Sequence, residues 1–591
     1  MTTHIKNPPA EAALSANALY ILQQRYLRKD AGGRLLETPA GMFRRVASAV
    51  AANDARFCSP SSAVHLEEMY YGLMARLEFL PNSPALLNAG RNGGQLSSCF
   101  CLMPDPAGLS VASLIQMAQT VHRSGGGTGF NFSGIPAVHR PVEWISPLSG
   151  AMLAAKQGGI RQGCSIVVLD VHHPHIMEFI RAKDDPAVLS NFYLGVALSN
   201  EFMQALETGG SYPLRDPGGD GEYGELDARR VFDSIVLQTW KTGDPGVIFS
   251  DRIESGNPVP HLGRIKGVSG CGEQMLLANE SSVLGSINLA RMTGAGGSAL
   301  DFNRLRQTVS LAVRMLDNMI DINHYPLPEV REITLKTRKL GLGVMGLADL
   351  LIKLGLPYDS PEALDTAARV MDFINRTAHE TSAELAGERG VFPAYAGSTY
   401  DRSDGRKMRN ASLTTVAPTG TISIIAGCSA GIEPLFSLVY MRHVLEGDSL
   451  LEVNQDMVKV ARRRGFYSDG LIRKLAGGAG LRDIDGVPED IRRLFVTGAD
   501  IDSGWHVAMQ AAVQRHVDNA VSKTVNLPAG ATPADVAGVY LKAYEMGLKG
   551  ITIYRDRSRP NQPLSSGTVD GTLLEAYLRR GRFNTAEAGV S

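Results

Sequence analysis

The segment Ser165-Ile-Val-Val-Leu-Asp170 is a short apolar run bounded by polar residues, which is typical of a buried strand. A second run of this kind is Tyr193-Leu-Gly-Val-Ala197, and Gly, Asn and Pro residues break the chain between such runs. Longer amphipathic stretches at 305–322 and 361–385 have the periodicity of helices. Because short buried strands alternate with helices, the sequence predicts an α/β fold with a largely parallel sheet.

The chain before residue 79 and the chain after residue 560 differ from this pattern. Apolar residues near the N-terminus recur at spacings of three and four, which predicts helices, beginning with Ala18, Leu19, Ile21, Leu22 and Tyr26. The last stretch is polar and weakly patterned. We therefore expect an N-terminal helical region at 1–78, an α/β region at 79–560 and a short tail at 561–591 with at most one helix, at 573–582.

The composition excludes several classes of protein. Lys and Arg number 59 against 60 Asp and Glu, and no basic run exceeds Arg462-Arg463-Arg464, so no nucleic-acid partner is expected. The N-terminus has no apolar signal core and no stretch approaches the length of a membrane span. Six cysteines without a CxxC or zinc-type spacing predict neither a disulfide framework nor a metal site. A cytoplasmic protein is expected.

The segment Ser269-Gly-Cys271-Gly-Glu273-Gln places a thiol and a carboxylate on one tight loop. A thiol in this position can act as a nucleophile, as a redox group or as the precursor of a thiyl radical, and the glutamate can act as a general base toward the same substrate. A single cysteine in a Gly-rich turn can equally be a small packed residue. The motif alone leaves both interpretations open.

A second pair of cysteines lies in Gly94-Gln-Leu-Ser-Ser-Cys99-Phe-Cys101. Residues two apart lie on the same face of a strand, and regular strand geometry holds them too far apart for an easy disulfide. Either can be a small buried hydrophobic residue, and for Cys101 this is the simpler interpretation.

Two Gly-rich segments offer backbone N–H groups to an anion. Residues 417–431 read as a Pro/Gly turn, a buried strand and a Gly/Ser turn, in which the hydroxyls of Thr419 and Thr421 could help to hold phosphate. Residues 124–129 are similarly permissive. No Walker A pattern is present, so neither segment implies a kinase or an ATPase, and either can be an ordinary loop.

Taken together and in order, these segments resemble the class II ribonucleotide reductases, which depend on adenosylcobalamin. The resemblance runs from about residue 14 to residue 564 and is carried by the blocks 81–90, 95–100, 124–133 (SGGGTGFNFS), 158–163, 271–274, 284–289, 338–347 (RKLGLGVMGL), 417–436, 516–528 and 550–556. The triple glycine at 125–127 favours the cobalamin class over the di-iron class. The tyrosine pair that the di-iron class uses near its C-terminus is also absent from the sequence.

The resemblance implies a ten-stranded α/β barrel made of two parallel half-barrels, with a central finger loop that presents the radical cysteine. By motif, Cys271 would be the thiyl-radical residue and Glu273 the base on the ribose 3′-hydroxyl. Ser269 and Cys99 would complete the catalytic group. Adenosylcobalamin would supply the radical and the protein would supply position and exclusion of water.

The resemblance also implies binding residues and partners. Substrate-binding residues would be Ser83 and Ser98 at the ribose and Pro418, Thr419, Gly420, Thr421 and Ser423 at the phosphates. Cofactor-binding residues would be Gly125, Gly126 and Gly127. The substrate would be a ribonucleoside di- or triphosphate, and a homodimer with a nucleotide effector would be expected.

Three departures from the family pattern bear on the reaction. The position at which the family has the redox partner of Cys99 corresponds to Ser282. Ser269 and Gly270 stand where the family has Asn and Pro before the radical cysteine. No cysteine follows Cys428, so the family's Cys-containing tail has no counterpart in this sequence.

These departures favour a redox-neutral radical reaction, because one thiol and one serine cannot form a dithiol couple. An epimerisation or a dehydration at the sugar is then expected, which would make the enzyme isomerase-like. The first alternative is a true reductase making 2′-deoxyribonucleotides with an external reductant such as formate or a small thiol. The second alternative is a catalytically silent nucleotide-binding relative, against which the retention of Cys271 and Glu273 argues.

Overall fold

The computed structural model describes residues 13–103, 110–155, 163–185, 188–219, 222–294, 297, 299–403, 405–444, 448–559 and 564–587. The N-terminal region is helical, as its periodicity predicts. It consists of α1 (Ala16–Ile21), a π-helical turn (Leu22–Tyr26), α2 (Pro39–Asp54) and α3 (Pro60–Ala75). The helices α2 and α3 each begin with a capping hydroxyl followed by proline, which starts a helix without wasting a backbone N–H.

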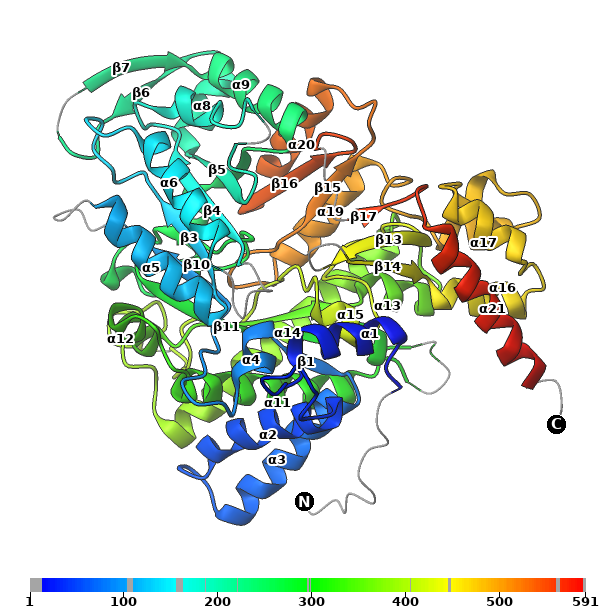
Figure 1. Ribbon diagram of the computed structural model, residues 1–591. Coiled ribbons are helices and arrows are strands. Elements are labelled where there is room, and N and C mark those ends of the chain that lie inside the picture. The colour runs from blue at the N-terminus through cyan, green and yellow to red at the C-terminus, as the bar shows by residue number, and fades with distance from the viewer. Residues whose placement is uncertain are drawn as a thin grey trace.

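Five parallel strands form the first half of the barrel. In spatial order they are β2 (Cys99–Leu102), β3 (Gly127–Asn131), β4 (Ser165–Asp170), β5 (Phe192–Leu198) and β8 (Gly246–Phe249). The helices of this half are α5 (Val111–Ser124), α6 (Pro141–Leu153), α7 (Ile176–Ile180), α8 (Asn200–Thr208), α9 (Ala228–Thr242) and α10 (Ser250–Ser255), and a hairpin of β6 (Ser211–Arg215) and β7 (Glu222–Asp227) lies at its edge (Figure 1).

A second set of parallel strands closes the barrel. It consists of β11 (Glu280–Asn288), β12 (Leu340–Met345), a bridging segment at 414–416, β15 (Thr524–Leu527) and β16 (Gly550–Arg555). Where the two halves meet, β11 pairs with β2 and β16 pairs with β8, both in antiparallel direction. The short strand β1 (Phe79–Pro81) also pairs with β11 in antiparallel direction. The predicted α/β barrel of two parallel half-barrels is confirmed.

Helices also belong to the second half. They are α4 (Ser83–Asn88), α11 (Phe302–Ile322), α12 (Pro328–Thr337), α13 (Leu347–Leu354), α14 (Pro361–Arg389), α15 (Ile422–Ala426), α19 (Ser503–Gln514) and α20 (Pro533–Glu545). Short 3₁₀ turns lie at Pro260–Leu262, Leu289–Arg291 and Leu481–Asp483. Among the described helices, none is long and apolar enough to cross a membrane.

A short hairpin of β9 (Gly267–Val268) and β10 (Met275–Leu276) carries the loop that the sequence predicts as the finger. It lies inside the barrel against both halves. A Cβ on Gly129 of β3 would fall 1.7 Å from the carbonyl oxygen of Val268, so only glycine lets the hairpin pass there. On the other side, the Ala520 N–H and the Thr415 hydroxyl donate to the carbonyl of Glu273 at 3.0 and 2.7 Å.

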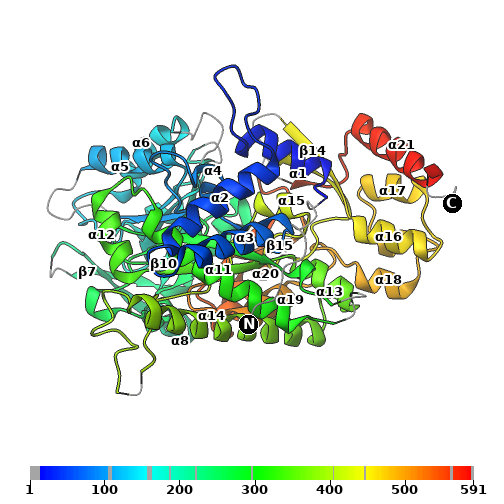
Figure 2. The ribbon, with the colours of Figure 1, turned by 90° about the horizontal axis from the view of Figure 1, so that it is seen from below.

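A satellite unit with its own apolar core lies on one side of the barrel in both views (Figures 1 and 2). It contains β13 (Val439–Val444), β14 (Asp448–Val453), β17 (Leu564–Ser565), α16 (Gln455–Arg463), α17 (Asp469–Ala476), α18 (Glu489–Leu494) and α21 (Gly571–Glu587). The helix predicted at 573–582 is therefore longer than expected. Leu574 and Leu578 of α21 are buried in this core, which gives the C-terminal helix tertiary support that its own pattern does not reveal.

One local expectation was wrong. The apolar run after Thr421 was predicted to be a buried strand, and it forms the short helix α15. Thr419 has a left-handed backbone (φ 54°), which turns the chain, and the Ser423 N–H then bonds the Thr419 carbonyl at 2.9 Å. The tertiary position of the turn overrides the strand preference of the isoleucines.

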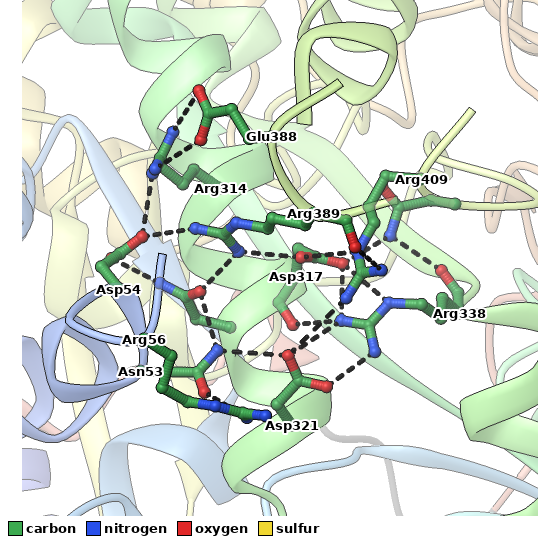
Figure 3. Close-up of polar contacts among 12 residues, drawn as sticks. Asn53, Asp54, Arg56, Arg314, Asp317, Asp321, Arg338, Glu388, Arg389 and Arg409 are labelled. Atoms are coloured by element: carbon green, nitrogen blue, oxygen red, sulfur yellow. Dashed lines mark hydrogen bonds and ion pairs between the residues drawn. The ribbon is translucent and has the colours of Figure 1, made fainter. Parts of the chain in front are cut away.

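A buried ionic cluster ties the helical region to the barrel (Figure 3). Asp54 of α2 pairs with Arg314 and Arg389, and Arg389 also reaches Asp317 of α11 at 2.9 Å. Asp317 further accepts from Arg338 at 2.7 Å. Helices that are distant in the sequence are therefore joined through shared guanidinium groups.

Candidate active site

The finger loop turns at Gly272, whose backbone is left-handed (φ 79°). The Ser269 N–H bonds the Gln274 carbonyl at 3.0 Å, and the Gly272 N–H bonds the Ser269 carbonyl at 2.9 Å. These bonds close a tight turn with Cys271 at its tip, where the side chain is exposed. The Gly-Cys-Gly spacing thus presents one thiol from an otherwise buried loop.

Glu273 is a buried carboxylate within this loop. It accepts the Ser269 hydroxyl at 2.8 Å and the Cys99 thiol at 3.3 Å, and no ion pair to it is found among the described residues. Burial raises the pKa of Glu273, and a backbone hydrogen bond together with the bonds from Ser269 and Cys99 opposes that rise only in part. A carboxylate in this environment binds a proton more strongly than one in water, which suits a general base.

Cys99 lies on β2, beside Glu273 of the finger loop. Its neighbour across the sheet is Ser282 of β11. The register therefore puts a hydroxyl, not a thiol, directly opposite Cys99. The Ser282 hydroxyl donates to the Lys339 carbonyl at 3.3 Å. Burial, followed by the nearby Glu273 charge, raises the pKa of Cys99 well above its usual value, so this thiol stays protonated.

Cys101, the second thiol of β2, belongs to a different environment. It is fully buried opposite Glu280, and burial raises its pKa to about 12. Glu280 forms a buried ion pair with Lys339 at 2.9 Å. These contacts support the interpretation of Cys101 as a packed residue.

The predicted phosphate segment forms a turn followed by α15. The Thr419 hydroxyl accepts from the Gly431 N–H at 2.8 Å, which joins the two ends of the segment. Arg25 donates to the Thr421 hydroxyl at 3.3 Å, so a guanidinium group stands beside the predicted phosphate position. The Ser423 hydroxyl is buried and has no hydrogen-bond partner among the described residues, which leaves it free to donate to a ligand.

A large cavity of about 1250 Å³ opens next to this segment. Its walls include Ser423 and Ser429 from the phosphate side, Arg442 from the satellite unit and Tyr193 from β5. The nearby Cys164 thiol, then burial, then the Cys271 thiol raise the pKa of the Tyr193 phenol. The cavity therefore borders the phosphate segment, the satellite unit and Tyr193, and its walls are both polar and apolar.

The structure brings some predicted residues together and leaves others apart. Ser98 contacts the Cys99 thiol at 3.6 Å, and Ser83 shares a hydrogen bond of 2.7 Å with the Tyr26 hydroxyl. The predicted cofactor-binding glycines at 125–127 do not line the large cavity. At Gly126 and Gly127, close packing explains why the residue is glycine. A Cβ on Gly126 would lie 2.5 Å from the Phe100 ring, and one on Gly127 would lie 2.9 Å from the Cys164 carbonyl.

Two residues of the site escaped the sequence reasoning. Arg25 lies on the π-helical turn of the N-terminal region and reaches the phosphate segment only through tertiary packing. Cys164 directly precedes β4, and its thiol donates to the Gly270 carbonyl at 2.9 Å. An arginine within an amphipathic helix and a cysteine before a strand carry no local signal, although the Gly-rich block at 158–163 marks the neighbourhood of the second.

Family models match nearly the whole chain. The all-alpha domain of ribonucleotide reductase matches residues 12–94, and the barrel domain of ribonucleotide reductase matches residues 97–554. The fold and the finger site thus define a large subunit of the ribonucleotide reductase type, and the chain belongs to this family.

Individual relatives narrow the comparison. The chain is 44% identical to a vitamin B12-dependent ribonucleoside-diphosphate reductase of Mycobacterium tuberculosis, over 96% of this chain and 83% of the relative. It is 41% identical to the enzyme of the same name from Thermoplasma acidophilum, over 94% and 81%. The alpha subunit of the Actinobacillus ureae class Id ribonucleotide reductase shares the fold, with a TM-score of 0.74 over 92% of this chain and 97% of that one at 20% identity.

Proposed function

We propose that this enzyme uses adenosylcobalamin to reduce ribonucleoside diphosphates to 2′-deoxyribonucleotides. The observation that carries the proposal is the finger tip, where Cys271 is exposed above a buried Glu273 that holds the Cys99 thiol. The relatives named as vitamin B12-dependent ribonucleoside-diphosphate reductases support both the cofactor and the substrate class. The expected homodimer and nucleotide effector remain predictions.

The residues present fit adenosylcobalamin, which is a large cofactor. The cavity of about 1250 Å³ exceeds the range of roughly 300–1,000 Å³ that holds drug-sized ligands. The buried hydroxyls of Ser423 and Ser429 have no hydrogen-bond partner among the described residues and are available to a ligand. Tyr193 and Arg442 would contribute an aromatic and a cationic wall.

In the proposed mechanism the protein positions the reacting groups and excludes water. When bound, adenosylcobalamin would supply the radical chemistry that starts the reaction. Cys271 gives up its thiol hydrogen atom and can then take the 3′-hydrogen of the ribose. Glu273 accepts the proton of the 3′-hydroxyl, while Ser269 holds the carboxylate in place. Cys99 offers a hydrogen from its protonated thiol.

The source of the electrons decides between the two reactions that the cysteine pattern allows. Because Ser282 lies opposite Cys99, no two thiols face each other between β2 and β11. A reductase of this sequence therefore needs electrons from an external reductant. The redox-neutral reaction that this loss favours receives no support from the relatives, which are named reductases. We therefore propose reduction with an external reductant and keep epimerisation or dehydration as outcomes of the test.

The test is an anaerobic incubation of the protein with adenosylcobalamin and each common ribonucleoside diphosphate, with and without dithiothreitol, followed by mass spectrometry of the nucleotide. A product lighter by one oxygen, formed only with reductant, is expected. A product of unchanged mass with altered retention, or one lighter by a water and independent of reductant, would overturn the proposed reduction. The Cys271→Ala variant serves as the control and should give no product.

A further inference from the structure

The thiol of Cys164 is in direct contact with the finger tip. Its Sγ–H donates to the carbonyl of Gly270 at 2.9 Å, one residue before Cys271. Cys164 is also the largest influence that raises the pKa of Cys271, which agrees with two neighbouring thiols. A thiol that directly precedes β4 therefore lies at the finger tip, next to the residue before Cys271.

The backbones at this point are also in close contact. A Cβ on Gly270 would lie 2.7 Å from the Cys164 carbonyl oxygen and 3.1 Å from the Cys164 Cβ. Only glycine at position 270 lets the finger approach β4 so closely. This close approach of the two backbones places the following residue, Cys271, next to Cys164, and a disulfide requires its two Cβ atoms to lie about 3.5–4.5 Å apart.

We propose that Cys164 and Cys271 are a redox pair that forms a reversible disulfide at the finger tip. With a disulfide oxidant, one thiolate displaces one thiol from the oxidant to give a mixed disulfide, and the second cysteine displaces the other thiol. The two cysteine sulfurs lose two electrons and two protons in total, and the oxidant is reduced to two thiols.

This disulfide would act as a protective lock. Cys271 cannot become a thiyl radical while its sulfur is bound to Cys164. The same bond shields the exposed sulfur from irreversible oxidation to sulfinic and sulfonic acids. A thiol reductant reopens the pair. Since the neighbouring Cys164 raises the pKa of Cys271, the thiolate is scarce at neutral pH and closure accelerates as the pH rises.

Cys99, the other thiol near the finger tip, is less favourably placed to form a disulfide with Cys271. Cys99 is held by its hydrogen bond to Glu273, and it is buried while Cys271 is exposed. Cys164 instead contacts the finger backbone at Gly270, the residue before Cys271. We therefore expect the link to form between 164 and 271, not between 99 and 271.

The pair has a consequence for the assay of function. A reductant that only reopens the disulfide would restore activity even when it is present in catalytic amount. This holds whether or not the reaction itself consumes electrons. Dependence on dithiothreitol alone therefore does not identify a reductase, and the mass of the nucleotide product does.

The test is peptide mapping of the full-length protein without cofactor. The protein is treated anaerobically with oxidised glutathione between pH 7 and pH 9.5, quenched with acid, blocked with N-ethylmaleimide and digested with trypsin. The expected peptides 162–181 and 267–291 each contain one cysteine, and peptide 92–123 contains Cys99 and Cys101. A species joining 162–181 to 267–291, formed faster at higher pH and removed by dithiothreitol, is expected.

Matched variants make the outcome decisive. The linked species should disappear in Cys164→Ala and persist in Cys99→Ala and in Cys58→Ala, which lies in the helical region. A link between 92–123 and 267–291, a stable glutathione adduct on Cys271, or an unmodified Cys271 at every pH would each overturn the pair. Because the readout needs neither cobalamin nor nucleotide, failure of the proposed function would leave this result unchanged.

Discussion

Two buried carboxylates in this molecule, Asp317 in the ionic cluster and Glu273 in the finger, have opposite electrostatic environments. Burial alone would raise the pKa of both. At Asp317, the charges of Arg338, Arg409 and Arg389 outweigh burial and the pKa falls (Figure 3). Glu273 has only a hydroxyl and a thiol as side-chain partners, and its pKa rises.

The difference separates a structural carboxylate from a reactive one. A carboxylate surrounded by guanidinium groups is fixed in its charged form and joins helices, but it cannot take up a proton near neutral pH. A buried carboxylate without a cation can exchange its proton with a substrate hydroxyl. Isosteric substitutions at the two positions should therefore have different consequences.

The largest effect is expected from Glu273→Gln. The amide cannot accept the proton of the 3′-hydroxyl, so turnover should fall by about 10²- to 10⁴-fold. The melting temperature should not fall, since the substitution removes an uncompensated buried carboxylate. Steady-state rates and thermal unfolding of the same preparation measure both. Retained turnover would contradict the proposed role of Glu273 as a base.

Asp317→Asn should have the opposite profile. Three arginines then lose the charge that compensates them, and breaking a buried ion pair costs about 3–5 kcal/mol of stability. Urea unfolding should show this loss of stability. At low temperature, where the variant is folded, it should keep its hydrogen-transfer chemistry. An unchanged unfolding midpoint would show that the cluster does not stabilise the fold.

Ser282→Cys tests whether the missing dithiol limits the reaction. The new thiol would lie directly opposite Cys99, where an antiparallel pair is close enough for a disulfide. Without any added reductant, the reduced variant should make up to one deoxynucleotide per chain and end with a disulfide. The unsubstituted enzyme should make none under these conditions, and equal yields from both would contradict the argument from Ser282.

The smallest effect is expected from Ser269→Ala. The serine hydroxyl stabilises the charged form of Glu273 and lowers its pKa, so removing this hydroxyl should raise the pKa further. The base acts when deprotonated, so the acid limb of the rate profile should move to higher pH by about one unit or less. Rates at high pH should stay close to those of the parent enzyme. An acid limb that does not move would argue against contact between these two side chains.

Much of the fold and part of the site follow from local sequence. The apolar run 165–170 contains the β-branched residues that favour a strand and forms β4, and the amphipathic stretch 305–322 lies within α11. Cys271 and Glu273 are two residues apart in a Gly-rich turn, so their proximity needs no tertiary information. The position of Ser282 opposite Cys99 agrees with the departure that the sequence indicates.

The remaining features depend on tertiary structure. The run after Thr421 has strand-forming residues and becomes a helix because its turn is tied to Gly431. Arg25 and Thr421 meet only because the helical region packs against the barrel. Cys164 reaches Cys271 only when the first half-barrel encloses the finger. Periodicity and turn chemistry are local and can be read from the chain, whereas these contacts arise from closure of the barrel, which joins segments that no local pattern relates.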